Sequence, residues 1–98
     1  MNTTKNKHGV YIRDGRQTYI IRAHKTRLYK IGSSLQPDVR IEELRNMNAD
    51  TLVIVKVFPF DIEADLHLRF ASQRQHGEWF TESKDLLNLI LDKEALVR

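Results

Sequence analysis

The chain has 98 residues and a mass of 11.5 kDa, which is enough for one small domain with a single hydrophobic core. Its 41% apolar and 30% charged residues are typical of a globular protein, and they exclude a collagen-like fibre and a disordered tail. The absence of cysteine excludes disulfides, a thiolate nucleophile and a cysteine-ligated zinc site.

Positive charge is concentrated in the first third of the chain. Residues 1–30 carry eight Lys or Arg and one acidic residue, whereas residues 31–98 carry eight basic and twelve acidic residues. A one-sided basic segment is the electrostatic footprint of a phosphate-backbone partner, although a solvated tail has the same composition, so both interpretations stay open. No apolar run approaches the roughly 18 residues that span a bilayer, and no signal core is present, so we expect a cytoplasmic protein without membrane association.

The N-terminal part of the chain predicts a polar tail followed by strands. Residues 1–8 lack apolar periodicity and caps, so we expect a disordered basic N-terminus, with a single domain over residues 9–98. Residues 10–13 and 18–22 resemble strands, and the intervening Asp14-Gly15 suits a tight hairpin turn because Gly tolerates positive φ. Residues 28–31 form another expected strand after a polar basic loop.

The middle of the chain predicts a helix and an apolar strand. Pro37 fits the first turn of a helix, which continues through Ile41, Leu44 and Met47 at helical spacing. Residues 52–57 are nearly all β-branched and apolar, which is typical of a central strand that is covered on both faces.

The C-terminal part predicts two more helices. Asp61 is expected to cap a helix with a buried stripe of Ile62, Leu66 and Phe70, and Gly77 to close the basic turn that follows. Ser83 is expected to cap a third helix whose inward-facing residues are Leu86, Leu87, Ile90, Leu91 and Val97. The order of elements predicts an α+β fold, a small three-stranded antiparallel sheet flanked by helices, with residues 10–13 as an extra N-terminal strand.

Two polar groups interrupt the apolar faces of the helices. Arg40 falls on the same side of its helix as Leu44, so its guanidinium needs a carboxylate or phosphate partner, unless its stem covers apolar surface while the head reaches water. Glu63 and His67 lie four residues apart on the next helix, where a Glu could hold a divalent cation and a His could contact a phosphate. An ordinary surface pair has the same spacing, so both interpretations stay open.

Two aromatic residues, Trp79 and Phe80, follow a flexible and partly basic turn. They are either core residues or platforms on which nucleic-acid bases stack. The chain has no glycine-rich phosphate loop and no Ser, His, Asp arrangement that the spacing could support, which argues against nucleoside-triphosphate chemistry and acyl transfer.

An ordered series of segments resembles the GIY-YIG nuclease superfamily, in the short branch found in phage reading frames and in meiotically up-regulated fungal proteins. The resemblance covers roughly residues 17–92, and the segments that carry it are Thr18-Tyr19-Ile20-Ile21, Tyr29-Lys30-Ile31-Gly32-Ser33-Ser34, Pro37 with Arg40-Ile41-Glu42-Glu43-Leu44, Glu63-Ala64-Asp65-Leu66-His67-Leu68-Arg69-Phe70, and Arg74 with Gly77-Glu78-Trp79-Phe80.

The resemblance implies four site residues. The first tyrosine of the superfamily falls on Tyr19, the second tyrosine position on Lys30, the helix arginine on Arg40 and the metal-binding glutamate on Glu63. Tyr11, in Gly9-Val10-Tyr11, is another candidate for the first tyrosine, but the expected spacing to Lys30 is 11 residues, as from Tyr19, and not 19. Tyr29 cannot replace the missing second tyrosine, because adjacent strand residues point to opposite faces.

The resemblance implies a metal-dependent endonuclease that hydrolyses phosphodiester bonds in DNA, with RNA as an alternative substrate. Tyr19 and Lys30 would activate water, Lys30 by lowering the pKa of Tyr19 or by taking part in proton transfer, and Arg40 would contact the scissile phosphate. Glu63 would bind one weakly held Mg²⁺ or Mn²⁺ ion. The remaining expected contacts to nucleic acid are His67, Arg74, Arg22, Lys25 and Arg27.

Two other functional classes remain open. The first is a nucleic-acid-binding module of the same fold that is inactive because Lys30 replaces the tyrosine. The second is a protein-interaction domain that inserts Trp79 and Phe80 into a partner. A domain this small has little surface for reading bases, so weak intrinsic specificity, a homodimer or a partner protein is expected.

Overall fold

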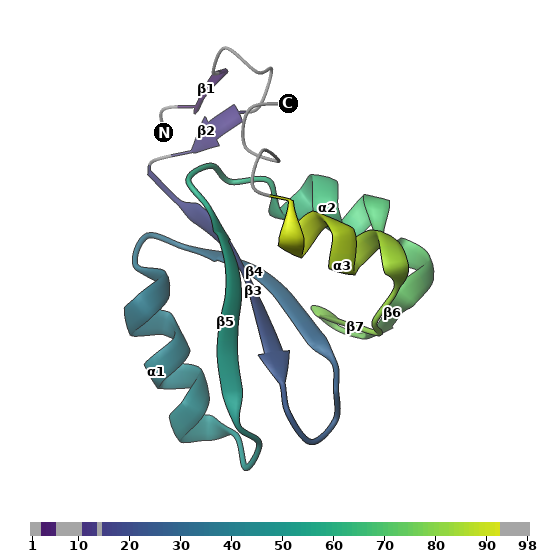
Figure 1. Ribbon diagram of the computed structural model, residues 1–98. Helices are drawn as coiled ribbons and strands as arrows, with labels where there is room; N and C mark the ends of the chain where they lie inside the picture. Colours follow the sequence, from purple (N-terminus) through teal and green to yellow (C-terminus); the bar gives the residue numbers. More distant parts are fainter. Residues whose placement is uncertain (1–2, 6–10, 14, 93–98) are drawn as a thin grey trace.

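A five-stranded antiparallel sheet forms the centre of the fold, with the strand order β5-β3-β4-β7-β6 (Figure 1). The structure is a computed structural model, and it describes residues 3–5, 11–13 and 15–92. The strands of this sheet are β3 (Gln17–Ala23), β4 (Tyr29–Ser34), β5 (Leu52–Phe58), β6 (Arg74–His76) and β7 (Trp79–Phe80). The predicted α+β class is confirmed, but the sheet has five strands where three were expected.

The two additional strands come from the segment that was expected to be a turn. Gly77 has a φ of +53° in the loop that joins β6 to β7, a conformation that favours glycine. Because β6 and β7 have three and two residues, they are too short to show the alternation by which strands are recognised in a sequence.

The N-terminal strands form a sheet of their own. β1 (Thr3–Lys5) pairs with β2 (Tyr11–Arg13), so the predicted hairpin between residues 10–13 and 18–22 is wrong. Both edges of β3 are occupied by β4 and β5, which leaves no edge for β2.

The expected disordered tail, residues 1–8, contains β1. Residues 1–2 and 6–8 lie outside the described residues, so the domain boundary at residue 8 stays a prediction.

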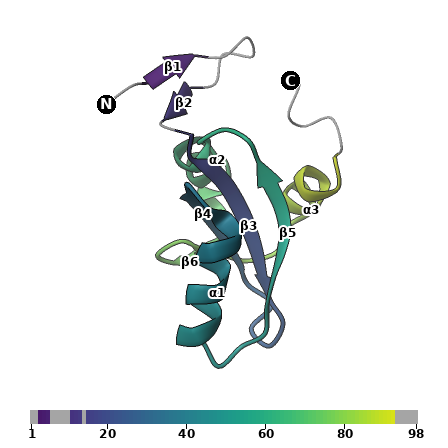
Figure 2. The ribbon, with the colours of Figure 1, turned by 90° about the vertical axis from the view of Figure 1, so that its left-hand side faces the viewer.

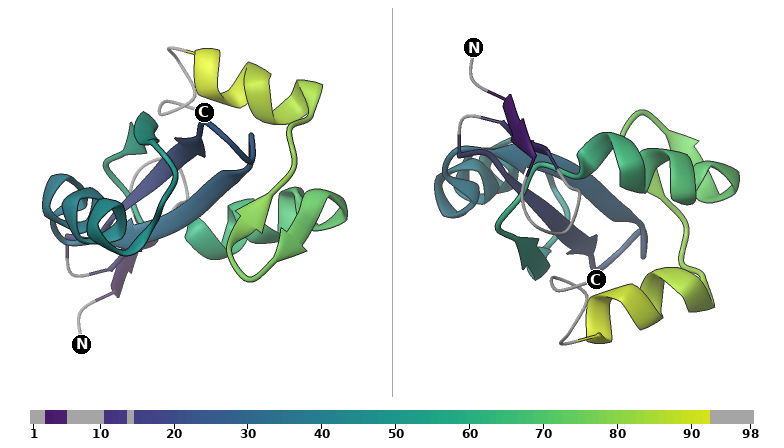
Figure 3. Two further views of the ribbon diagram at one scale, coloured as in Figure 1. Left: turned by 90° about the horizontal axis from the view of Figure 1, so that it is seen from below. Right: turned by 90° about the horizontal axis from the view of Figure 1, so that it is seen from above.

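Helices cover both faces of the sheet (Figures 2 and 3). They are α1 (Pro37–Met47), α2 (Glu63–Arg69) and α3 (Lys84–Leu91), with a 3-10 turn, η1 (Ala71–Gln73), after α2. Successive residues of β3 serve the two faces in turn: Tyr19 and Ile21 pack with α1, whereas Ile20 packs with α2 and α3. In the described part of the chain, no helix is long and apolar enough to cross a bilayer.

β5 is covered on both faces as predicted, but it is an edge strand and not a central one. Val55 and Phe58 pack on the side of α3, whereas Leu52 and Val57 pack on the side of α1. The apolar run therefore shows that both faces of the strand are covered. It does not show whether the strand has neighbours on both edges or on one. The open edge leaves Val53 49% exposed.

The predicted start of α1 and the predicted cap of α3 are confirmed: Pro37 begins α1, and Ser83 Oγ accepts a hydrogen bond of 3.1 Å from the backbone N–H of Leu86. The predicted cap at Asp61 is wrong, because Ile62 is the N-cap of α2, although Asp61 Oδ1 accepts a bond of 3.4 Å from Glu63 N–H.

Two predicted inward-facing residues are wrong. Met47 is 66% exposed because it ends α1, and Leu91 is 75% exposed. Leu91 follows the buried Leu86 by five residues, about 140° around the helix, so Leu89 takes the inward position. Val97 lies outside the described residues.

Candidate active site

Four elements carry the predicted site residues: β3, β4 and α1 place three of them on the α1 side of the sheet, and α2, which packs on the other face, carries the fourth. Tyr19 on β3 is paired in register with Gly32, and Ile21 with Lys30, so the two side chains share the face that α1 covers. Arg40 comes from α1 itself. Glu63 is the first residue of α2, which packs beside β4. The contacts form two sets, one of Tyr19 with Arg40 and one of Lys30 with Glu78 and Glu63, and the charges of the two glutamates act on Tyr19.

The phenol of Tyr19 is buried and contacts Arg40. The Tyr19 side chain crosses directly over Gly32, where a Cβ would lie 2.5 Å from the phenol oxygen. Burial raises the pKa of Tyr19, while a hydrogen bond from Arg40 and its charge act in the opposite direction. The cation in contact with the phenol is therefore Arg40 and not Lys30, which was expected to lower this pKa. With a raised pKa, Tyr19 is a neutral phenol at pH 7.

Gly32→Ala is expected to displace the Tyr19 ring. A methyl group at position 32 would lie 2.7 Å from Tyr19 Cζ as well as 2.5 Å from the hydroxyl oxygen, so a buried ring and not only a mobile tip must move. We expect a loss of about 1–3 kcal/mol in the free energy of unfolding. The contact between Tyr19 and Arg40 should also be lost, which a changed near-UV circular dichroism spectrum and thermal denaturation would show. Gly15→Ala cannot serve as the control, because Gly15 has a φ of +76° and an alanine there would itself be strained. Ala71→Gly, at an exposed position, is used instead to measure the effect of an alanine–glycine exchange away from the site.

Lys30 and Glu63 meet through a residue that the sequence interpretation did not select. Glu78 lies in the β6–β7 loop, and its Oε1 is 2.6 Å from Lys30 Nζ. Burial would raise the pKa of Glu78, but hydrogen bonds from Lys30 and from Glu63 lower it below its usual value. The Lys30 ammonium is itself buried in this ion pair.

The carboxyl groups of Glu63 and Glu78 are hydrogen-bonded to each other. Burial raises the pKa of Glu63, and the hydrogen bond and charge of Glu78 raise it further. Ser33 and His67 act in the opposite direction. Two carboxylates this close repel each other, so the pair would be stabilised by a bound cation.

This pair suits a hard divalent cation that keeps several waters. Mg²⁺ takes oxygen ligands and is typically held by one or two carboxylates together with substrate phosphates. Within residues 3–5, 11–13 and 15–92, no group of three or more His, Cys, Asp or Glu side chains could hold a metal ion. The residues present therefore fit a weakly held ion and not a preformed metal cage.

His67 and Arg74 form a chain that ends at the backbone of β4. His67 Nε2 lies 2.8 Å from the carbonyl oxygen of Ile31, and Arg74 Nη2 lies 3.0 Å from His67 Nδ1. A carbonyl only accepts and a guanidinium only donates, so Nε2 carries the proton and Nδ1 accepts. Both nitrogens are engaged, which makes His67 a positioning group 3.6 Å from Glu63 Oε2 and leaves no nitrogen for a proton shuttle.

Arg40 borders an open surface hollow of about 310 Å³ that also contains Arg16. Arg40 is partly exposed, and its Nη1 donates to Glu43 Oε1 at 3.1 Å. Arg16 is fixed to β4 by Ser33, with Nε 3.1 Å from Oγ and Nη2 2.7 Å from the carbonyl oxygen. Arg16 and Arg40 both line this hollow, and two guanidinium groups make it suitable for an anion such as a phosphate.

The other predicted basic residues are not brought to this site. Arg22 points to the opposite face of the sheet, where its Cζ lies 6.0 Å from the centre of the Tyr29 ring. Lys25 and Arg27 lie in the β3–β4 loop, and Lys25 follows Tyr19 by six residues, or about 20 Å of extended strand. Any contact of these three residues with nucleic acid stays a prediction.

Glu78 and Arg16 are the site residues that sequence reasoning missed. Glu78 was read as part of a loop, and it meets Lys30 across 48 positions of sequence. Arg16 was counted only within the basic N-terminal segment. The pairing of β4 with β7 places Glu78, and the pairing of β3 with β4 places Arg16. These pairings join distant parts of the chain, so the spacing of residues within one segment does not reveal them.

Comparison with known proteins gives one match. The T5orf172 domain, a phage-type domain associated with nuclease-like proteins, matches residues 16–94. Searches of curated proteins and of solved structures found no match. The matched range contains the five-stranded sheet, the three helices and every site residue named above, and the chain therefore belongs to the T5orf172 domain family.

Proposed function

We propose that this protein is a metal-dependent endonuclease of the GIY-YIG type that hydrolyses phosphodiester bonds in DNA. The observation that supports the proposal is the contact network in which Tyr19 meets Arg40, Lys30 meets Glu78, and Glu78 meets Glu63. The association of the T5orf172 family with nuclease-like proteins points to the same class of function.

Tyr19 and Lys30 would prepare the attacking water. As a neutral phenol, Tyr19 can accept a hydrogen bond from water and donate one, so it orients the water beside the scissile phosphorus. Lys30 is held at 2.6 Å from Glu78, and this ion pair places an ammonium next to a carboxylate of lowered pKa. Either member could take part in the proton transfer that accompanies attack.

Arg40 would hold the scissile phosphate. Its Nη1 is engaged by Glu43, and a guanidinium has five N–H donors in total, so donors remain for phosphate oxygens. Arg16 borders the same hollow and adds a second positive charge. The two groups would compensate the negative charge that grows on the phosphate oxygens in the transition state.

Glu63, supported by Glu78, would hold the divalent ion. A Mg²⁺ or Mn²⁺ ion bound there supplies Lewis-acid stabilisation of charge on phosphate oxygens. His67 would fix the direction of the Glu63 carboxylate, because its own orientation is set by Ile31 and Arg74.

A cleavage assay with added and removed metal tests the proposal. Supercoiled plasmid, single-stranded DNA and RNA would each be incubated with Mg²⁺, with Mn²⁺ or with EDTA, and binding would be followed by fluorescence anisotropy at several salt concentrations. Cleavage only in the presence of a divalent ion supports the proposal. Salt-sensitive binding without cleavage would instead identify an inactive nucleic-acid-binding module, and the absence of binding would favour a protein-interaction domain.

Arg40→Ala is expected to weaken both binding and cleavage. A hydrogen bond to a charged group contributes about 1.5–3 kcal/mol, so we expect a loss of roughly tenfold to a hundredfold in DNA affinity and a further loss in single-turnover rate. Arg69→Ala is the control, because Arg69 is an exposed arginine that pairs with Asp85 away from the site. An unchanged rate in Arg40→Ala would remove Arg40 from the proposed phosphate contact.

A further inference from the structure

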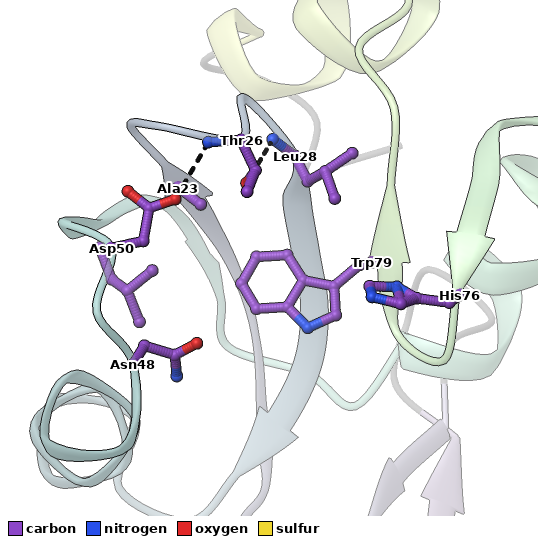
Figure 4. Close-up of a pocket in the computed structure, with 8 residues that line it drawn as sticks. Ala23, Thr26, Leu28, Asn48, Asp50, His76 and Trp79 are labelled. Carbon is purple, nitrogen blue, oxygen red and sulfur yellow. Dashed lines mark hydrogen bonds between the residues drawn. The ribbon is translucent and has the colours of Figure 1, made fainter.

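A second pocket lies on the same face of the sheet, at the end opposite Tyr19. It encloses about 170 Å³ between the indole of Trp79 and the segment that follows α1 (Figure 4). Ala23 and Leu52 line its base. Its volume is below the roughly 300–1,000 Å³ of sites for drug-sized ligands, so it suits a single planar ring system.

Trp79 forms one wall of this pocket, which separates its role from that of Phe80. Phe80 is fully buried in the core beneath α2 and α3, whereas Trp79 is partly exposed on the α1 side. Figure 4 shows the indole between the loop that carries Thr26 and the chain near Asn48, with His76 beyond its other end. The partly exposed ring is a surface on which another flat ring can stack.

Asn48 supplies a fixed polar group opposite the indole. Its Nδ2 donates to the carbonyl oxygen of Leu44 at 2.7 Å, which sets the plane of the carboxamide. Figure 4 shows the amide oxygen on the side of Trp79. The neighbouring Asp50 carboxylate accepts backbone N–H groups of Lys25 at 2.7 Å and Thr26 at 3.0 Å, so its charge is engaged in holding the β3–β4 loop.

Trp79, which lines the pocket, also lies close to Lys30 of the candidate active site. Lys30 Nζ lies 5.8 Å from the centre of the Trp79 ring and 2.6 Å from Glu78 Oε1, so the ammonium stands between the pocket and the carboxyl pair. Ala23, at the pocket, and Tyr19, at the active site, are on the same face of β3 and about 13 Å apart along the strand. A strand whose phosphate lies near Tyr19 can therefore place a neighbouring base in the pocket.

We propose that this pocket binds one unstacked nucleobase next to the cleaved phosphodiester, and that Asn48 favours a base with an exocyclic amino group, adenine above all. The base stacks on Trp79, while the amide oxygen of Asn48 accepts a hydrogen bond from the exocyclic amino group. The pocket thus gives a small domain a preference at one nucleotide position. This inference rests on the proposed function in that it takes DNA as the substrate.

The fluorescence of Trp79 tests the proposal directly, because Trp79 is the only tryptophan in the chain. The probes are single-stranded oligonucleotides of dA, dC or dT, added in EDTA so that binding is measured without cleavage. We expect saturable quenching, with dA bound about tenfold or more tightly than dT. Moving one abasic nucleotide along the dA strand should weaken binding at one position more than at the others.

Substitutions at Asn48 test the pocket without changing Trp79, so the test still works if a change at Trp79 damages the fold. Asn48→Ala should remove the preference for dA over dT while keeping the quenching. Asn46→Ala is the matched control, because Asn46 is an exposed asparagine in the last turn of α1 that does not line the pocket. Trp79→Leu should weaken binding to all three oligonucleotides, and Trp79→Phe should restore part of it.

The outcomes separate this inference from the proposed endonuclease. Quenching with a preference for dA, in a protein that cuts no DNA, would support the pocket and contradict the nuclease. Anisotropy that shows binding without any change in Trp79 emission would overturn the pocket, as would an Asn48→Ala variant with an unchanged preference, even if metal-dependent cleavage were present.

Discussion

Glu63→Gln is expected to lower metal-dependent cleavage by about a thousandfold or more while leaving DNA binding in EDTA nearly unchanged. Removal of the negative charge deprives the divalent ion of its main ligand, and an ion that stabilises transition-state charge contributes several kcal/mol. The fold should survive, because glutamine keeps the size of the side chain and its amide can donate a hydrogen bond to the Glu78 carboxylate. Single-turnover cleavage and anisotropy on the same oligonucleotide measure the two effects.

The matched control for this substitution is Asp65→Asn. Asp65 is an exposed carboxylate two residues further along α2, so the change removes the same charge from the same helix without touching the site. We expect the control to cleave within a factor of about two or three of the unmodified protein. Equal cleavage by Glu63→Gln and the control would contradict the role of Glu63.

Tyr19→Phe is expected to lower the cleavage rate by about a hundredfold or more. The substitution removes only the hydroxyl that would orient the attacking water, and positioned groups of this kind contribute roughly 10²–10⁴-fold. The aromatic ring over Gly32 is retained, so the lost hydrogen bond to Arg40 should cost only about 1 kcal/mol of stability. The rate at saturating DNA should fall while the affinity changes little.

Tyr29→Phe provides the comparison for this second substitution. Tyr29 is also buried, but its hydroxyl donates to Glu82 at 2.8 Å on the opposite face of the sheet. Its removal should affect stability by a similar amount and leave the rate unchanged. If both variants lost activity equally, the effect of Tyr19→Phe would be structural and would not support a role in orienting water.

Local sequence signals were sufficient for those elements whose ends are set by local chemistry. Pro37 marks the start of α1 and Ser83 the cap of α3, because a missing N–H and a capping hydroxyl act within one helical turn. The order of strands is not a local property. β5 has the composition of a central strand because helices cover both its faces, yet it lies at the edge, and β2 found its partner in β1 and not in β3.

The same division applies to the candidate site. The resemblance selected Tyr19, Lys30, Arg40 and Glu63, and the contacts that link them are those described above. It assigned no role to Glu78, although Glu78 lies in one of the segments that carry the resemblance, because the ion pair with Lys30 depends on the pairing of β4 with β7. Arg22 was expected to contact nucleic acid because it is basic. Side chains alternate along β3, however, so Arg22 lies on the face opposite Tyr19.

A cation at the carboxyl pair formed by Glu63 and Glu78 is the central feature of the proposed endonuclease site. Crystals of the protein with an uncleaved oligonucleotide, soaked in Mn²⁺ and measured at the manganese absorption edge, would locate the ion by its anomalous signal. The account predicts one peak within coordination distance of a Glu63 oxygen, with a phosphate oxygen between it and Arg40. A peak elsewhere, or none at a metal concentration that supports cleavage, would contradict it.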